Sequence, residues 1–97
     1  MQVKYDFEAS VWRYNALSSW CFVSIPAYMA QEIREFFGRE EAGFGRLPVN
    51  ASIGVTTWKT AIWFDTKHKT YLLPVKSSVR KQEGIAEHAL VRVSIFI

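Results

Sequence analysis

The chain has 97 residues, 49% of them hydrophobic and including four Trp and seven Phe, which is enough for one apolar core and excludes a largely disordered chain. Its formal net charge is only +3, and no apolar run approaches the roughly 20 residues that a membrane-spanning helix needs. The single cysteine, Cys21, excludes an internal disulfide and a zinc-finger ligand set; the first ten residues lack the features of a signal peptide, so we expect a cytoplasmic protein.

The N-terminal region predicts two strands. Residues 3–11 alternate apolar and polar side chains with the two-residue period of a half-buried strand. Residues 14–19 are rich in turn formers, and residues 20–25 are apolar enough for a second strand. We therefore expect these two strands to form a hairpin.

A helix is predicted to follow. Pro26 ends the second strand and starts the helix, because proline donates no backbone N–H and has a helical φ. The apolar face of this helix carries Met29, Ile33 and the pair Phe36–Phe37. Gly38 is expected to end the helix in the left-handed conformation.

The second half repeats these kinds of element. Residues 47–53 and 58–64 alternate as strands, and a polar loop at 65–69 leads into a further strand at 70–73. Pro74 is expected to end that strand and open a short helix, which Gly84 ends.

Residues 89–97 alternate as the last strand. The order of elements therefore occurs twice along the chain. Trp12-Arg13 matches Trp58-Lys59, and Ile25-Pro26 matches Leu73-Pro74, at offsets of 46 to 48 residues. The repeat predicts two interlocking halves around one core, since neither half can bury its own sheet face.

Basic residues concentrate in the second half. Between positions 59 and 81 there are six Lys or Arg against one acid. Lys76 and Arg80 lie four residues apart on the short helix, and with Lys59 and Lys81 they are candidate phosphate contacts. The alternative is an ordinary solvated surface, in which cations offset the helix dipole and Glu83 partly neutralises Arg80.

The loop Gly43–Arg46 is a second candidate for anion binding, because Arg46 follows two glycines whose backbone amides can face an anion. It lacks the third glycine of a dinucleotide fingerprint and the Lys of a P-loop. The alternative is a tight turn with Phe44 packed beneath it.

Two tryptophans are out of phase with the apolar faces of their strands. Trp12 and Trp63 therefore either cap the barrel or lie on its exposed side, where they suit stacking on a base or docking of a protein. We expect one of the two to belong to the core.

No catalytic set is predicted. His68 and His88 are 20 positions apart, and Cys21 lies on a strand, so neither a triad nor a metal site follows from their spacing. We expect no enzyme activity, no cofactor and no metal.

Residues 71–95, YLLPVKSSVRKQEGIAEHALVRVSI, resemble the strand–Pro–helix–Gly–turn–strand unit of the AbrB/MazE-type swapped-hairpin regulators. In that family two chains each supply one half of a double-split β-barrel that binds DNA. The resemblance implies that one chain here does what two chains do there, and this removes the simple reason for reading a palindromic site.

A second resemblance covers nearly the whole chain. The segments YDFEASVWR, WCFVSIP, GFGRLPV, TTWKTAIWFD, YLLPVKSSVRKQEGI and VRVSI resemble, in order and spacing, a small bacterial family that is known only as a domain of unknown function. The resemblance implies a single-chain double-split barrel, often fused ahead of a YdeI/OmpD-associated bacteriocin-protection domain. The chain departs from the family pattern at Ala86–Ala89, where Glu-Gly-Asp is usual, and at Gly54-Val55, where two glycines are usual.

Together these observations predict a mainly β fold, a small double-split β-barrel with two short helices and an internal pseudo-two-fold repeat, as one domain over residues 1–97. The function predicted first is a non-catalytic binding or accessory module of the bacterial cytoplasm, monomeric, contacting a protein or an acidic partner and no membrane. The alternatives are a nucleic-acid-binding module and a small-anion site at Gly43–Arg46.

Overall fold

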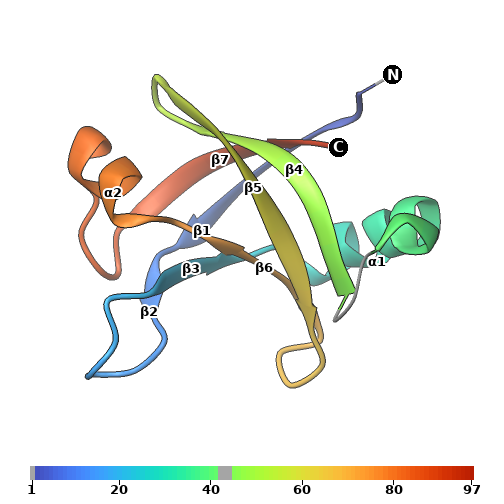
Figure 1. Ribbon diagram of the computed structural model, residues 1–97, viewed down its shortest axis with the longest axis horizontal. Coiled ribbons are helices and arrows are strands. Elements are labelled where there is room, and N and C mark those ends of the chain that lie inside the picture. The colour runs from blue at the N-terminus through green and yellow to red at the C-terminus, as the bar shows by residue number, and fades with distance from the viewer. Residues whose placement is uncertain (1, 42–44) are drawn as a thin grey trace.

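The computed structural model describes residues 2–41 and 45–97, and its main feature is one seven-stranded antiparallel sheet curled into a half-barrel with two helices (Figure 1). The strand order is β1-β7-β4-β5-β6-β3-β2. The strands are β1 (Lys4–Ser10), β2 (Trp12–Arg13), β3 (Cys21–Ser24), β4 (Arg46–Ile53), β5 (Thr56–Asp65), β6 (Thr70–Pro74) and β7 (Leu90–Phe96). The mainly β prediction is confirmed.

The two ends of the strand order are joined through one residue. β1 pairs along its whole length with β7, whereas β2 pairs with β3, and only Val11 separates β1 from β2. Val11 continues the ladder, because its N–H donates to Ala89 O at 2.9 Å and its carbonyl accepts from His88 N at 2.7 Å. The predicted hairpin between the first two long strands is therefore wrong except at residues 12–13, because β1 finds its partner at the other end of the chain.

The concave side of the sheet holds the core. The predicted alternation of the first strand is confirmed, since Tyr5, Phe7 and Val11 are buried between exposed polar neighbours. The largest side chains that are almost completely buried come from five strands, from both helices and from residues beside the strands, and include Tyr71, Ile25, Ile33, Leu47, Ile62, Leu73 and Ile95. Burying these apolar surfaces is the main force that closes the sheet.

Helix α1 (Ala27–Phe37) follows Pro26 as predicted. Ile33 is buried and Phe37 packs against the core, but Phe36 is 69% exposed and does not belong to the inward face. The prediction for Gly38 is wrong: its φ of −57° is right-handed, and the chain continues into the 3-10 turn η1 (Gly38–Glu40).

Helix α2 (Ser77–Glu83) ends at Gly84, whose φ of 63° confirms the predicted left-handed C-cap. Val79 faces the core. Pro74 is the last residue of β6 and lies before the helix, so Lys76 takes the N-cap position. Within the two described stretches of the chain, neither helix is long and apolar enough to cross a membrane.

A shift of 50 residues relates the backbone hydrogen bonds of the two halves. Ile25 N donates to Tyr71 O at 3.0 Å, and Val75 N donates to Cys21 O at 2.9 Å; each bond becomes the other when 50 is added or subtracted. The helices obey the same shift, because Pro26 O and Lys76 O each accept from the residues three and four positions later. The backbone hydrogen bonds therefore show the predicted repeat, but with an offset of 50 residues instead of the predicted 46 to 48. Pro26 accordingly corresponds to Lys76 rather than to Pro74.

The two halves interlock. Of the six strand pairings, four join a strand before Gly54 to a strand after it, namely β1 with β7, β3 with β6, β4 with β5 and β4 with β7. β3 and β6, which precede the two helices, are antiparallel neighbours in the same sheet. Neither half can therefore satisfy its backbone alone.

Candidate functional site

The convex face of the sheet carries a second set of apolar side chains. Phe22, Ala61 and Leu72 are buried, yet they do not belong to the core cluster. Residues that face each other across an antiparallel ladder lie on the same side of the sheet. By the register Trp12 shares a face with Phe22, and Trp63 with Leu72, so these side chains lie together outside the barrel.

The centre of this surface is a set of four rings, Trp12, Trp20, Phe22 and Trp63, which we call the aromatic platform. Phe22 lies 5.2 Å from Trp12, 6.0 Å from Trp20 and 6.4 Å from Trp63, measured between ring centroids. Trp20 and Trp63 lie 6.3 Å apart and are within 29° of parallel. Contacts of this length between aromatic rings stabilise a fixed arrangement.

Both out-of-phase tryptophans therefore lie on the outer side of the sheet. Trp12 and Trp63 are half-buried. The prediction that one of them belongs to the core is wrong, because β2 and β5 present them on the face opposite the core cluster. Trp12 is fixed by its indole N–H, which donates to Ser24 Oγ at 3.0 Å.

The platform follows the repeat of the fold approximately. Trp12 pairs with Phe22 as Trp63 pairs with Leu72; Phe22 and Leu72 are 50 positions apart, and the two tryptophans are 51 apart. Trp63 is thus the counterpart of Trp12 in the strand pairing, with one extra residue between the partners of the first half. The predicted match of Trp12 with Trp58 is wrong, because Trp58 belongs to the core.

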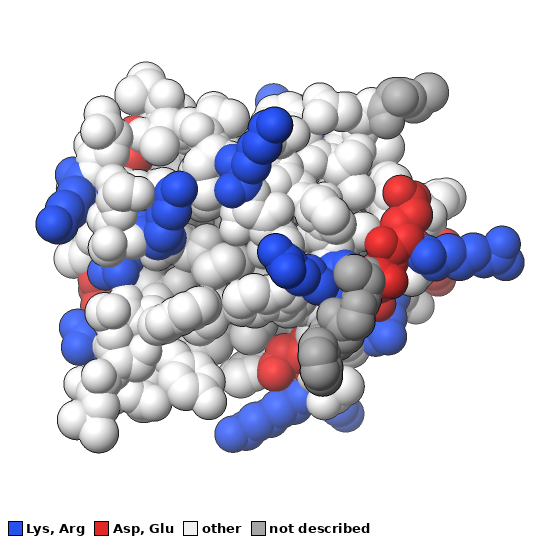
Figure 2. Space-filling view, viewed as in Figure 1, with Lys and Arg blue, Asp and Glu red and all other residues white. Residues whose placement is uncertain are grey.

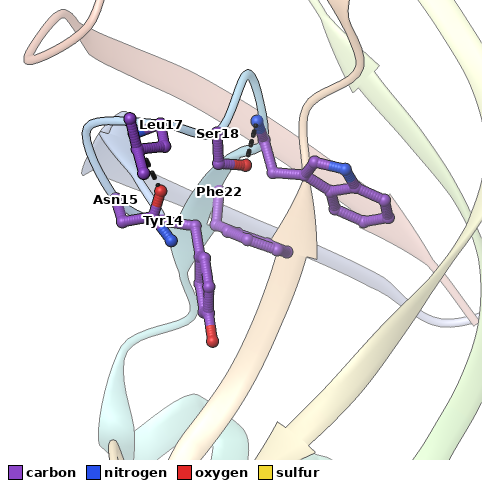
Figure 3. Close-up of a pocket in the computed structure, with 6 residues that line it drawn as sticks. Tyr14, Asn15, Leu17, Ser18 and Phe22 are labelled. Carbon is purple, nitrogen blue, oxygen red and sulfur yellow. Dashed lines mark hydrogen bonds between the residues drawn. The ribbon is translucent and has the colours of Figure 1, made fainter.

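The loop between β2 and β3 forms one edge of the platform (Figure 3). Tyr14, Asn15, Leu17 and Ser18 surround an open hollow of about 500 Å³ with Phe22 in its wall. Asn15 Oδ1 accepts from Leu17 N at 2.9 Å, and Ser18 Oγ accepts from the backbone N–H of Trp20 at 3.0 Å. Trp20 is 55% exposed, so one face of its ring is accessible.

Helix α2 forms a second edge. A hollow of about 400 Å³ lies between α2 and the platform, and Lys76 and Arg80 line it with Trp20, Trp63 and Pro74. Two of the five predicted basic residues are therefore together beside the rings. Their counterparts under the 50-residue shift are Pro26 and Ala30, so α1 does not repeat this pair of cations.

Arg80 has a structural partner that the sequence did not indicate. Its Nε donates to Val75 O at 3.0 Å, and its Nη2 donates to Ser19 O at 2.8 Å. Glu83 does not neutralise Arg80 as suggested; it accepts a hydrogen bond from Thr56 at 2.5 Å. Arg80 therefore positions the loop that carries Trp20.

The remaining predicted cations are distributed differently. Arg46 is the cross-strand partner of Trp63 and so shares its outer face, and Lys59 lies on that face four residues along β5, about 13 Å away. Lys81, on α2, lines neither the α2 hollow nor the loop hollow. Of the predicted anion loop, Gly43 and Phe44 lie outside the described residues, and Arg46 is exposed at the start of β4.

The β5–β6 hairpin forms the third edge, with a hollow of about 730 Å³ between it and Trp12. The His68 ring stacks on Trp12 at 5.3 Å and within 28° of parallel. His68 also binds Asp65, through Nδ1 at 2.5 Å and through its backbone N–H at 2.8 Å. These two hydrogen bonds, the side-chain one first, lower the pKa of the Asp65 carboxyl.

The charges surround the rings rather than covering them. Figure 2 shows a largely uncharged surface over β2 and β3, with charged side chains at its edges, among them the hairpin end of β5 and β6. The ion pairs of the described residues involve Lys4, Arg13, Arg34, Arg92, His68 and His88. In the described part of the chain, Arg46, Lys59, Lys67 and Lys76 are therefore not neutralised by an acid.

A further polar contact lies on the core side of the sheet. The hydroxyl of Tyr71 donates to the carboxylate of Glu41, and Arg34 lies 4.0 Å from the same carboxylate. Burial first, and then the contact with Glu41, raise the pKa of Tyr71 well above its usual range. This contact joins β6 to the segment that follows α1.

No metal centre is built by residues 2–41 and 45–97, where no three His, Cys, Asp or Glu side chains gather closely enough to hold an ion. Cys21 is a free, buried thiol. The position of Trp20 and Phe22 on the outer side of the sheet could not be predicted, because the segment WCFVSI has no polar alternation to reveal which side faces outward.

The comparison with known families gives one result. A family model described as "Domain of unknown function (DUF1905)" matches residues 7–95. The match extends from β1 into β7 and includes the whole platform and all five predicted basic residues. A comparison with curated proteins found no match.

Proposed function

The chain belongs to the DUF1905 family of unknown function, and we propose that it is a non-catalytic binding module that holds an acidic macromolecular partner against the aromatic platform. We place it, as a monomer, in the bacterial cytoplasm. For the fold we propose a single-chain double-split β-barrel of the AbrB/MazE type. The 50-residue hydrogen-bond relation and the four pairings between halves support that assignment.

The observation that carries the proposal is the apolar cluster outside the core. A Trp such as Trp20, 55% exposed beside two further rings, leaves apolar area in water that a partner would bury. The cations beside it, Lys76 and Arg46, complement a partner with negative charge.

The test is a titration of the protein with three labelled acidic polymers of different chemistry: poly-L-glutamate, heparin and a 12-nucleotide single strand. We expect at least one to bind at about 50 mM salt, to change the tryptophan emission, and to lose affinity in Trp20→Ala. Tyr28→Ala is the matched control, because Tyr28 is 74% exposed but lies on α1. The proposal fails if none of the three polymers binds, or if Trp20→Ala and Tyr28→Ala bind equally well.

A further inference from the structure

We infer that the acidic partner is single-stranded nucleic acid, with its bases stacked on Trp20 and Trp63 and its phosphates beside Lys76 and Arg46. This inference rests on the proposed function and specifies its ligand. It differs from recognition of duplex DNA, because the platform presents ring faces rather than a helix or ribbon that enters a groove.

The first argument is the arrangement of the rings. Trp20 and Trp63 come from different segments yet lie within 29° of parallel, and Trp12 and His68 form a second stacked pair at the other edge. From β2 to β5 the platform crosses three strand spacings, about 14 Å. Phe22, between the two pairs, is inclined by 35°, 32° and 59° to Trp12, Trp20 and Trp63. Two stacked ring pairs at different edges of one surface suit unpaired bases, each of which has a π-face.

The second argument is the position of the charges. Lys76 lines the hollow between α2 and the two tryptophans, and Arg46 lies directly across the ladder from Trp63. Both lie beside the rings without covering them, as a backbone contact requires. Lys59 extends the same outer face by about 13 Å along β5.

The surroundings of the platform also differ in their balance of charge. The hairpin hollow is lined by Asp65 together with Lys67 and His68, whereas the residues described around the α2 hollow include Lys76 and Arg80 and no acid. The α2 side, where Lys76 lies and Arg80 holds the loop, is the side for the backbone.

The experiment is fluorescence anisotropy with labelled 12-mer oligothymidylate at about 50 and 200 mM salt. An abasic strand of the same length, which keeps the phosphates but has no bases, separates stacking from charge. A 12-bp duplex and labelled poly-L-glutamate are the other arms. We expect the thymidylate to bind more tightly than all three, with a slope of log K against log salt of about −2 if three phosphates are contacted.

Variants test the assigned residues. Trp20→Ala should weaken binding about tenfold, whereas Trp20→Phe should retain most of it because a ring remains. Lys76→Ala should reduce the magnitude of the salt slope by about 0.7, and Lys4→Ala, which removes the same charge from β1, should leave it unchanged. Circular dichroism of each variant confirms that it is folded.

Equal affinity for the abasic strand would overturn the inference, as would tighter binding of the duplex or no binding of the single strand. Tighter binding of poly-L-glutamate would also overturn it while leaving the proposed function intact. The failure of all acidic polymers, or equal binding by Trp20→Ala and Tyr28→Ala, overturns both.

Discussion

Arg80 on α2 and Ser19 in the loop before β3 are joined by a 2.8 Å hydrogen bond across 61 positions of the chain, from the guanidinium Nη2 to the carbonyl oxygen. The same guanidinium holds Val75 O through Nε. A residue predicted as a phosphate contact therefore also sets the position of the neighbouring Trp20. A movement of the Arg80 side chain would therefore also move the loop that carries Trp20.

Arg80→Ala is expected to lower the free energy of unfolding by about 1 kcal/mol, since two hydrogen bonds to carbonyls are lost. Amides of residues 14–20 should exchange with solvent faster, because the loop loses its tie to α2. Urea unfolding and hydrogen exchange measure both effects. Lys81→Ala, which removes a charge from the same helix, should change neither; equal effects of the two substitutions would contradict this role of Arg80.

Gly54→Ala should destabilise the protein more than Gly84→Ala. Both glycines have a left-handed φ, 60° and 63°, so each substitution costs about 1 kcal/mol through the backbone. At Gly84 a Cβ meets nothing within 4 Å, but at Gly54 it would lie 1.9 Å from Glu83 Oε1. The Glu83 side chain must then move and lose Thr56, at a further cost of about 1 kcal/mol.

A double-mutant cycle with Glu83→Ala isolates that second cost. In the Glu83→Ala background, Gly54→Ala should destabilise no more than Gly84→Ala does. The measurement is the midpoint of urea unfolding. An unchanged penalty in that background would mean that Glu83 does not oppose a side chain at position 54.

Tyr71→Phe tests the buried hydroxyl and its pKa. Because the folded-state pKa lies above the unfolded value of 10.0, the stability linked to Tyr71 is complete below pH 10 and is lost as the pH rises towards the folded value. Near neutral pH the variant should be less stable by about 1 kcal/mol, since the contact with Glu41 is lost.

Above pH 10 the wild type should lose stability by about 1.4 kcal/mol per pH unit more than Tyr71→Phe does. Tyr28→Phe, at a residue 74% exposed, serves as the control and should show the wild-type slope. Parallel pH profiles of wild type and Tyr71→Phe above pH 10 would contradict the raised pKa.

Asp65→Asn tests the hairpin edge of the platform. The folded-state pKa of Asp65 lies below its ordinary value of 3.8, so its contribution to stability is present above that pH and lost as the pH falls below it. Asparagine keeps an acceptor for the backbone N–H of His68 but removes the negative charge. The side chain at position 65 is partly exposed, so solvent screens that charge. We expect a loss below about 1 kcal/mol at pH 7.

The difference between wild type and Asp65→Asn should be smaller at pH 3 than at pH 7, as measured by urea midpoints at the two pH values. A gap that stays constant would assign the effect to the shape of the side chain rather than to its charge.

Local patterns in the sequence predict the elements well. The alternation of residues 3–11, the helix after Pro26 and the left-handed Gly84 are all confirmed, because each depends on neighbours within a few positions. The partner of β1 could not be predicted in this way, since the ladder from Lys4 to Ser10 joins residues that are up to 92 positions apart. The left-handed conformation predicted for Gly38 was wrong for a related reason. After α1 the chain continues into a right-handed 3-10 turn towards Glu41, which the residues near Gly38 in the sequence do not indicate.

The site was predicted only in part. The alternation of the strands indicated that Trp12 and Trp63 face away from the apolar side, but this alternation does not tell which rings contact each other. Phe22 lies between them on a strand that is apolar on both sides. No two-residue alternation of apolar and polar residues therefore indicated that Phe22 faces outward. Lys76 and Arg80 were found together because four residues span one helical turn.

The pairing of β1 with β7 has a consequence for synthesis on the ribosome. The strand that is translated first lacks its only long partner until the last strand has left the exit tunnel, and β4 lacks one of its two neighbours for the same time. A nascent chain must therefore carry unpaired edges and exposed apolar side chains until β7 has been synthesised. Cooperative folding of the sheet can follow only then, in one step that pairs β1 with β7.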